Sequence, residues 1–248
     1  MAKDVIVACD FASADETIKF LDKVTRIRDE VVACDHVSLL KRPFVKIGME
    51  LFYAEGPQII KTLKDRGHKV FLDLKLHDIP NTVKKTMQVL GAYGVDMVNL
   101  HAAGGIEMME AAKAGLMLGA TRFSEKPKLI AVTQLTSTDE EIMHRELLID
   151  KPLDEVVRQY ALNAKEAGLD GVVCSAFEAA DIHRYCGDDF LTVTPGIRIS
   201  KDGSDDQKRV MTPAEAKAAG SDYIVVGRPI TAADKPSDAY AEVVEAFL

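Results

Sequence analysis

The feature that most constrains this fold is a series of eight short apolar segments separated by longer stretches of helical character. Apolar runs of this length, rich in Val, Ile and Leu, are typical of buried β-strands. The eight segments are Val5–Cys9, Phe44–Ile47, Val70–Leu74, Met97–Leu100, Leu129–Val132, Gly171–Cys174, Leu191–Val193 and Tyr223–Val226.

Stretches with helical patterning lie between these strands, so the order of elements is strand, helix, strand along the chain. Such alternation predicts βαβ units and a parallel sheet. Eight units favour a closed (β/α)8 barrel of the TIM type over an open sheet, and residues 1–248 suit one α/β domain of about 250 residues. The helical stretches include Thr82–Tyr93, Ile106–Leu118, Leu153–Glu166, Pro213–Ala219 and Ala239–Phe247.

Three connections are longer than the rest: Arg26–Arg42, Thr136–Pro152 and Gly196–Thr212. The first mixes apolar and charged residues and is expected to hold an extra turn. The third is polar and contains glycine, which predicts a mobile loop or lid. No Gly-x-Gly-x-x-Gly motif follows any predicted strand, so a dinucleotide site has little support.

The third predicted strand contains charged residues that alternate with apolar ones. Side chains alternate between the two faces of a strand. In Lys69–Thr82 (KVFLDLKLHDIPNT), the even-numbered residues from 70 to 76 are apolar and should meet the outer helices. The odd-numbered residues from 71 to 77 should point into the barrel, so Asp73 and Lys75 are predicted to face inward about 6.6 Å apart along the strand.

A solvated edge strand could carry the same charges harmlessly, but the third of eight strands in a closed barrel has no free edge. Burying Asp and Lys is expensive unless they are paired, and such groups often mark functional sites. In barrel enzymes the chemistry lies at the C-terminal ends of the strands. Further polar groups lie on or after predicted strands and indicate a cleft there: Asp10, Lys46, Thr136, Gly227 and Arg228.

The loops after strands 7 and 8 indicate a phosphate site. Pro195–Arg198 (PGIR) opens the seventh loop, which also carries Gln207, and Gly227–Arg228 follows strand 8. Barrels commonly hold phosphate in these two loops. Glycine lets backbone N–H groups approach an oxyanion, and arginine adds charge-assisted hydrogen bonds.

Composition narrows the choice of partners. The formal net charge is -8, which opposes binding to nucleic acid. No apolar run approaches the roughly 20 residues of a membrane span, and the short run Val5–Cys9 is bracketed by Asp4 and Asp10, unlike a secretory signal. The four cysteines form no CxxC pair or Cys/His cluster, so we expect no metal site and a cytoplasmic protein with reduced thiols.

The run Asp73–Val83 (DLKLHDIPNTV) resembles the signature of the orotidine 5'-monophosphate decarboxylase family. The resemblance covers nearly the whole chain, and the long connection Arg26–Arg42 is a local departure that leaves the strand-2 motif intact. Further motifs follow in the family's order: Ala8–Asp10, Phe44–Gly48, Val132–Ser137, Pro195–Arg198, Asp206–Gln207 and Val226–Ile230.

The resemblance implies decarboxylation of orotidine 5'-monophosphate to uridine 5'-monophosphate in pyrimidine biosynthesis, without metal or cofactor. It implies that Lys75 protonates C6 of the pyrimidine and that Asp73 lies where the substrate carboxylate must lie. Lys46 and Asp78 would complete an alternating charge network, with Asp78 supplied by the neighbouring subunit of a homodimer.

The resemblance also implies how the nucleotide is held. Ribose hydroxyls would bind Asp10 and Lys46, with Thr82 reaching across from the partner subunit, and Thr136 would contact the pyrimidine edge. The phosphate would bind four residues: Arg198, Gln207, Gly227 and Arg228.

Two alternatives remain. A related phosphate-binding barrel lyase, such as a hexulose-phosphate synthase, shares the D-x-K-x-x-D strand but uses Mg²⁺ and typically has Glu at the strand-2 position. Lys46 stands there in this chain, and a lysine repels a dication. The second alternative is a non-catalytic nucleotide-binding barrel, which would bind nucleotide without releasing CO2.

Overall fold

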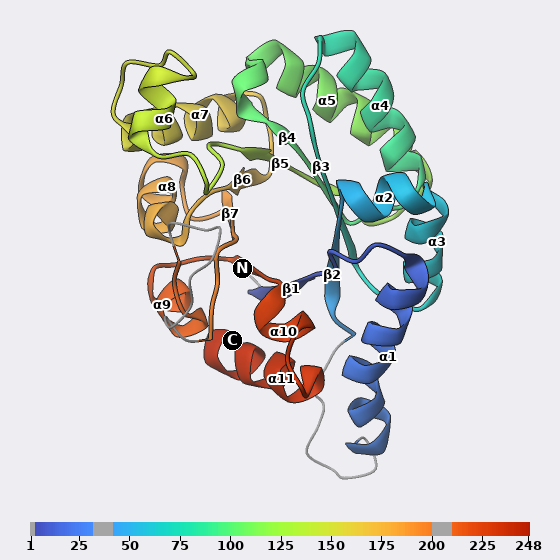
Figure 1. Ribbon diagram of the computed structural model, residues 1–248. Coiled ribbons are helices and arrows are strands. Elements are labelled where there is room, and N and C mark those ends of the chain that lie inside the picture. Colours follow the sequence, from blue (N-terminus) through green and yellow to red (C-terminus); the bar gives the residue numbers. More distant parts are fainter. Residues whose placement is uncertain (1–2, 32–41, 200–209) are drawn as a thin grey trace.

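The computed structural model describes residues 3–31, 42–199 and 210–248. The chain forms a closed barrel in which eight parallel strands pair in sequence order and β8 returns to β1, with helices around the outside (Figure 1). This confirms the predicted (β/α)8 fold. The strands are β1 (Asp4–Ala8), β2 (Phe44–Gly48), β3 (Val70–Leu76), β4 (Met97–His101), β5 (Lys128–Val132), β6 (Gly171–Val173), β7 (Leu191–Thr194) and β8 (Tyr223–Val226).

The five predicted helices are all present, with ends that differ from the prediction by no more than three residues. Two of them, α4 and α11, begin earlier than predicted, at a proline, which is tolerated in the first helical turn because its missing N–H needs no partner there. The α-helices are α1 (Ala14–Val31), α2 (Met49–Glu55), α3 (Gln58–Asp65), α4 (Pro80–Ala92), α5 (Ile106–Gly119), α6 (Glu140–Arg145), α7 (Leu153–Glu166), α8 (Ala179–Cys186), α9 (Pro213–Ala218), α10 (Arg228–Thr231) and α11 (Pro236–Phe247).

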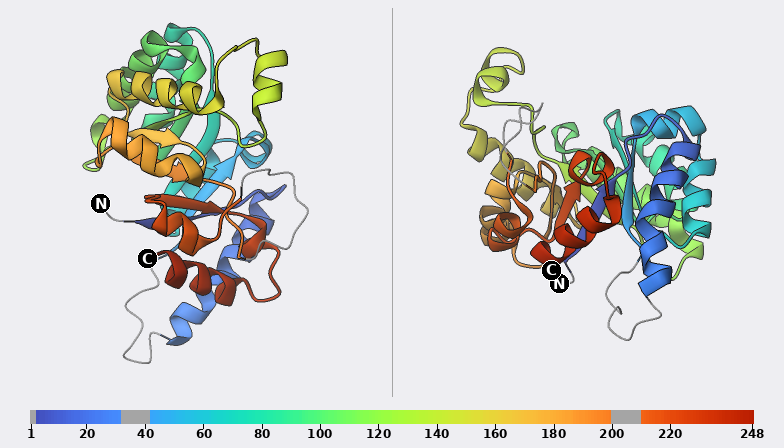
Figure 2. Two further views of the ribbon diagram at one scale, coloured as in Figure 1. Left: turned by 90° about the vertical axis from the view of Figure 1, so that its left-hand side faces the viewer. Right: turned by 60° about the horizontal axis from the view of Figure 1, so that its bottom comes forward.

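The long connections differ in how far the structure describes them. Helix α1 continues to Val31, so the predicted connection Arg26–Arg42 begins as helix, and residues 32–41 lie outside the described residues. The connection Thr136–Pro152 contains the short helix α6. This helix projects from the barrel, away from the C-terminus of the chain (Figure 2). None of the helices that the structure describes is long and apolar enough to cross a membrane.

The core has two layers separated by the wall of the barrel. A small apolar cluster fills the interior, to which Ile6, Phe71 and Met97 contribute from β1, β3 and β4. A larger cluster lies between the sheet and the helices and includes Leu72 and Leu74. Phe71 therefore points inward and its even-numbered neighbours point outward, as the alternation along strand 3 predicts.

Three aspartates repeat one arrangement at the N-terminal ends of the strands. Asp96, Asp170 and Asp222 directly precede β4, β6 and β8, and a glycine stands two positions before each. These glycines have φ values of 76°, 74° and 91°, a left-handed conformation that glycine adopts freely after a helix. We call these three groups the aspartate clamps.

In each aspartate clamp, one carboxylate oxygen connects a strand to a helix. It accepts a hydrogen bond from a backbone N–H near the start of β3, β5 or β7, at 2.7, 2.7 and 2.8 Å respectively. The same oxygen lies 2.6, 2.7 and 3.3 Å from a basic side chain on the preceding helix, contributed by Lys64, Lys113 and His183. The clamps therefore connect the N-terminal ends of β3 and β4, of β5 and β6, and of β7 and β8.

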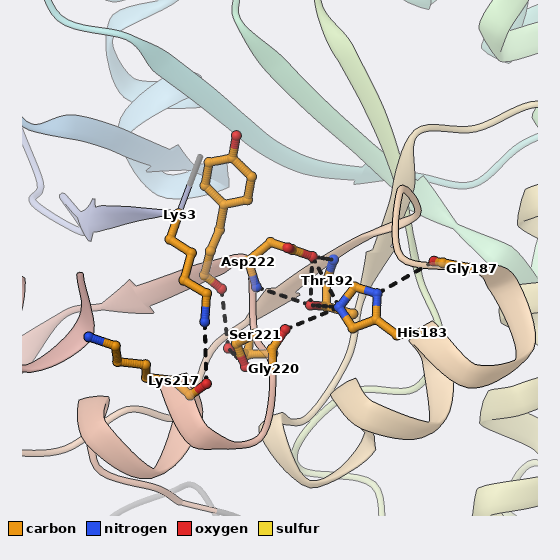
Figure 3. A network of polar contacts seen from close by, with 10 residues as sticks. Lys3, His183, Gly187, Thr192, Lys217, Gly220, Ser221 and Asp222 are labelled. Carbon is orange, nitrogen blue, oxygen red and sulfur yellow. Dashed lines mark hydrogen bonds and ion pairs between the residues drawn. The ribbon is translucent and has the colours of Figure 1, made fainter. Parts of the chain in front are cut away.

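The clamp at Asp222 is the most buried of the three (Figure 3). Its Oδ2 accepts hydrogen bonds from the backbone N–H and the hydroxyl of Thr192, at 2.8 and 3.0 Å. His183 Nε2 also lies 3.1 Å from the carbonyl oxygen of Gly220. Because Asp222 is only 6% exposed, water cannot replace these hydrogen bonds if the carboxylate is removed.

We predict that Asp222→Ala lowers the free energy of unfolding by about 2–3 kcal/mol, because it leaves buried donors of Thr192 without an acceptor. Urea denaturation followed by circular dichroism measures the change. Asp189→Ala, an exposed aspartate near the same strand, is the control and should change stability by less than about 0.5 kcal/mol. Equal midpoints for the two variants would contradict a stabilising role for the clamp.

Candidate active site

A cavity of about 320 Å³ opens at the C-terminal ends of the strands, the end of a barrel where enzymes of this fold place their chemistry. Its wall comes from β1, β2, β3, β5, β6 and β8 and from the segments that follow β1, β5, β6, β7 and β8. The floor includes the interior residue Phe71. Eight of the residues that the sequence analysis singled out line this cavity: Asp10, Lys46, Asp73, Lys75, Thr136, Arg198, Gly227 and Arg228.

Opposite charges alternate along one side of the cavity. Lys75 Nζ lies 2.6 Å from Asp73 Oδ1, and Lys46 Nζ lies 3.4 Å from Asp73 Oδ2. Lys46 also donates a hydrogen bond to Asp10 Oδ1 at 2.8 Å. The carboxylate of Asp73 is therefore shared by two ammonium groups, one on each oxygen.

The members of this network differ in how far their side chains are exposed to solvent. The side chains of Lys46 and Asp73 are 11% and 12% exposed, whereas that of Asp10 is 59% exposed. Lys46 reaches the interior because it stands on β2 between Val45 and Ile47, which point outward into the larger cluster. The side chain of Lys46 therefore lies on the inner face of the barrel.

The charges stabilise one another against the effect of burial. Burial opposes the charged form of Lys46, but the carboxylates of Asp73 and Asp10 outweigh it and raise the pKa of Lys46. Burial likewise opposes the ionised form of Asp73, but Lys46, Lys75 and hydrogen bonds from Lys75 and Asn99 lower its pKa. The buried pair therefore stays ionised on both sides of neutral pH.

The backbone of strand β3 is irregular at Lys75. This residue has a φ of 52°, a left-handed conformation that costs a non-glycine residue about 1–2 kcal/mol. The pairing of β3 with β4 shifts between Leu72 and Leu76, which marks a bulge. Despite this bulge, Lys75 lines the cavity and Leu74 and Leu76 pack outward, as the alternation predicts. His77, predicted to point inward as well, is exposed and does not line the cavity.

Asn99 on β4 completes the charged network, although the sequence analysis did not single it out. It is 2% exposed. Its amide donates a hydrogen bond to Asp73 Oδ1 at 2.7 Å, and its carbonyl oxygen accepts one from the backbone N–H of Lys75 at 2.8 Å. The sequence does contain an indication of this role. Asn99 is a polar residue within the apolar run Met97–Leu100, and it lies two positions after Met97, so it shares the inward face.

The far side of the cavity combines glycine with arginine. Gly196 and Arg198 follow β7, while Gly227 and Arg228 follow β8. The backbone N–H of Arg198 donates to the carbonyl of Met211 at 2.9 Å, and the N–H of Met211 donates to that of Gly196 at 3.1 Å. These two hydrogen bonds hold the start and end of the seventh loop together beside the cavity.

Two predicted site residues that the structure describes do not line the cavity of a single chain. Asp78 and Thr82 are exposed, on the segment after β3 and the first turn of α4, and neither contributes to the wall. Gln207 lies outside the described residues. Among the residues the structure describes, no group of three His, Cys, Asp or Glu side chains is placed to hold a metal ion.

Comparison with known proteins agrees with this architecture. The model of the family described as Orotidine 5'-phosphate decarboxylase / HUMPS matches residues 3–243. An orotidine 5'-phosphate decarboxylase from Geobacillus sp. (strain WCH70) is 54% identical over 235 residues, covering 95% of this chain and 92% of that protein. One from Bacillus cytotoxicus is 53% identical over 243 residues, covering 98% and 96%.

A solved structure shows the same fold over its full length. The crystal structure of orotidine 5'-phosphate decarboxylase from Lactobacillus acidophilus superimposes with a TM-score of 0.85 at 42% identity and covers 99% of both chains. The family model and these relatives span nearly all of this chain, including every strand of the barrel. The chain therefore belongs to the orotidine 5'-phosphate decarboxylase / HUMPS family.

Proposed function

We propose that this chain decarboxylates orotidine 5'-monophosphate to uridine 5'-monophosphate in pyrimidine biosynthesis, with Lys75 delivering the proton to C6. The observation that carries the proposal is the buried Lys75–Asp73–Lys46 network at the end of a barrel cavity, in a chain of this family. A cavity of about 320 Å³ lies within the range of small-ligand sites.

The two sides of the cavity suit the two ends of a nucleotide. Arg198, Arg228 and the glycines beside them provide a positively charged, closely approachable surface for the phosphate. Asp10 follows β1 and Lys46 lies on β2, and both line the cavity, so they can form hydrogen bonds with the ribose hydroxyls. Thr136, after β5, then faces the pyrimidine edge, and C6 lies toward Lys75.

The charges of the network suit a reaction that leaves an electron pair on carbon. Loss of CO2 from C6 gives a carbanion that the ring π-system does not delocalise. Preorganised charge must therefore stabilise it, and a fixed ammonium beside C6 does so most directly. Lys75 is held at 2.6 Å from Asp73, so its ammonium is oriented before the substrate arrives.

Asp73 acts on the substrate as well as on Lys75. Its carboxylate lies in the wall where the carboxylate of the substrate must approach, so repulsion is greater in the bound substrate than after CO2 has left. Binding energy from the distant phosphate offsets this repulsion. Lys75 then transfers its proton to C6, which leaves a neutral amine and uridine 5'-monophosphate.

We also propose that the chemical step needs no metal ion or organic cofactor. Lys46 Nζ lies between the carboxylates of Asp10 and Asp73, the two groups that would otherwise attract a dication. An ammonium group at this point reduces their combined negative charge and repels a dication. This favours decarboxylation over the Mg²⁺-dependent chemistry of related barrel lyases.

The active site is proposed to be shared between two subunits of a homodimer. Asp78 and Thr82 are exposed in the single chain. Ile79, directly after Asp78 in the sequence and directly before α4, is 68% exposed. A large apolar group exposed beside predicted site residues supports contact with another protein surface.

The first test is an absorbance assay with orotidine 5'-monophosphate in the presence of EDTA. We expect turnover that stays within about twofold of the rate without chelator, because no step uses a dication. Activity lost with EDTA and restored by Mg²⁺ would favour the metal-dependent lyase. Tight binding of uridine 5'-monophosphate without release of CO2 would favour a non-catalytic binding protein.

Lys75→Ala should reduce kcat by more than about 10²-fold, because it removes the proton donor. Binding of uridine 5'-monophosphate, measured by calorimetry, should remain detectable because the phosphate contacts are unchanged. The control is Lys61→Ala, whose side chain is 66% exposed on α3 and does not contribute to the cavity wall. Turnover of Lys75→Ala within about 10-fold of the parent would exclude the proton-donor role.

Mixing the inactive variants Lys75→Ala and Asp78→Ala should restore part of the activity. In a mixed dimer with shared sites, one site collects both substitutions and the other has neither. Turnover is measured after subunit exchange, which native mass spectrometry of differently tagged chains verifies. If exchange occurs and no activity returns, the two residues do not come from different subunits.

A further inference from the structure

We infer that Asn99 is a positioning residue that sets the location of the Lys75 ammonium group. Its side chain accepts a hydrogen bond from the backbone of the bulge in β3. This inference rests on the proposed function, because it assigns Asn99 a role in presenting Lys75 to the substrate. Asn99 itself does not line the cavity, so it acts through its two neighbours.

The pairing of β3 and β4 shows where the backbone needs such a residue. Leu72 pairs with Val98, and the next pair is Leu76 with Leu100. Three residues of β3, from 73 to 75, therefore lie opposite the single residue Asn99. A regular strand would place one residue there, so the normal ladder cannot supply partners for the extra backbone groups.

The Asn99 side chain replaces the missing part of the ladder. Its Oδ1 accepts the backbone N–H of Lys75 at 2.8 Å, in the place where a carbonyl of β4 would act in a regular sheet. This interaction holds Lys75 in its left-handed conformation, with φ at 52°. A buried N–H without an acceptor is unfavourable, so loss of Asn99 Oδ1 would favour a different backbone conformation at Lys75 and shift its ammonium group relative to Asp73.

The other half of the amide fixes the carboxylate that orients the lysine. Asn99 Nδ2 donates to Asp73 Oδ1 at 2.7 Å, and the same oxygen accepts from Lys75 Nζ at 2.6 Å. The two partners determine the orientation of the amide, because a backbone N–H cannot accept a hydrogen bond and a carboxylate cannot donate one. One side chain therefore fixes both the backbone and the head group of the Lys75–Asp73 pair.

Asparagine is suited to this position because it offers one donor and one acceptor without a charge. Leucine has a similar size but supplies neither hydrogen bond. Aspartate keeps the acceptor for Lys75, but when ionised it places a second negative charge beside Asp73. The substitutions Asn99→Leu and Asn99→Asp therefore separate loss of the hydrogen bonds from a change of charge.

We expect Asn99→Leu to lower kcat by about 10²-fold, because a displacement of about 1 Å in a reacting group has an effect of this size. KM should stay within about threefold, because contacts to phosphate and ribose are unaffected. The control is Thr133→Val, which removes a buried hydrogen bond from the residue directly after β5 to the carbonyl of Val173 on β6. Its kcat should stay near that of the parent.

The Asn99→Asp variant adds a signature that a purely structural role would not produce. When its new carboxyl is protonated, it can donate to Asp73 and accept from Lys75, as the amide does. When it ionises, it repels Asp73. The kcat of this variant should therefore approach the parent value at low pH and fall as pH rises, whereas Asn99→Leu should follow the parent profile at a lower level.

Hydrogen exchange of the Lys75 backbone amide tests the same inference without using activity. Exchange should be slow in the parent and in Thr133→Val, and at least about tenfold faster in Asn99→Leu, because the acceptor is lost. If the parent does not release CO2, the proposed function fails, while the exchange experiment still tests the role of Asn99. A kcat of Asn99→Leu within about threefold of Thr133→Val, or unchanged exchange at Lys75, would overturn the inference.

Discussion

The interaction on which the site depends is the sharing of one buried carboxylate by two ammonium groups. Asp73 receives Lys75 on one oxygen and faces Lys46 on the other, at 2.6 and 3.4 Å. None of the three could be buried alone without a large desolvation penalty. Together they form a fixed pattern of charge, with the ammonium of Lys75 at the point where we propose that a carbanion forms.

The barrel divides stability and chemistry between its two ends. At the N-terminal ends of the strands, the aspartate clamps satisfy backbone N–H groups and connect strands to helices. At the C-terminal ends, carboxylates and lysines face a cavity instead, and the backbone of β3 is bulged at Lys75. The same residue types therefore stabilise the fold at one end and line the proposed active site at the other. This division between the two ends is general for the architecture.

The local backbone at Lys75 shows why the site needs support from a neighbouring strand. A left-handed residue inside a strand is unfavourable by itself, and the bulge leaves an N–H without a partner on the β4 backbone. Asn99 supplies the acceptor from its side chain. The proposed proton donor thus depends on a residue 24 positions away that meets it only because β3 and β4 are adjacent.

Apolar runs and helical stretches in the sequence were sufficient to predict the eight strands, the closed barrel and the inward orientation of Phe71 and Asp73, because side-chain periodicity reports directly on burial. The tertiary structure alone decided the bulge at Lys75, the contact of Asn99 with Asp73 and the aspartate clamps. These features depend on which residues of neighbouring strands lie opposite one another, and that register is set by packing around the whole barrel, so no local stretch of sequence contains it.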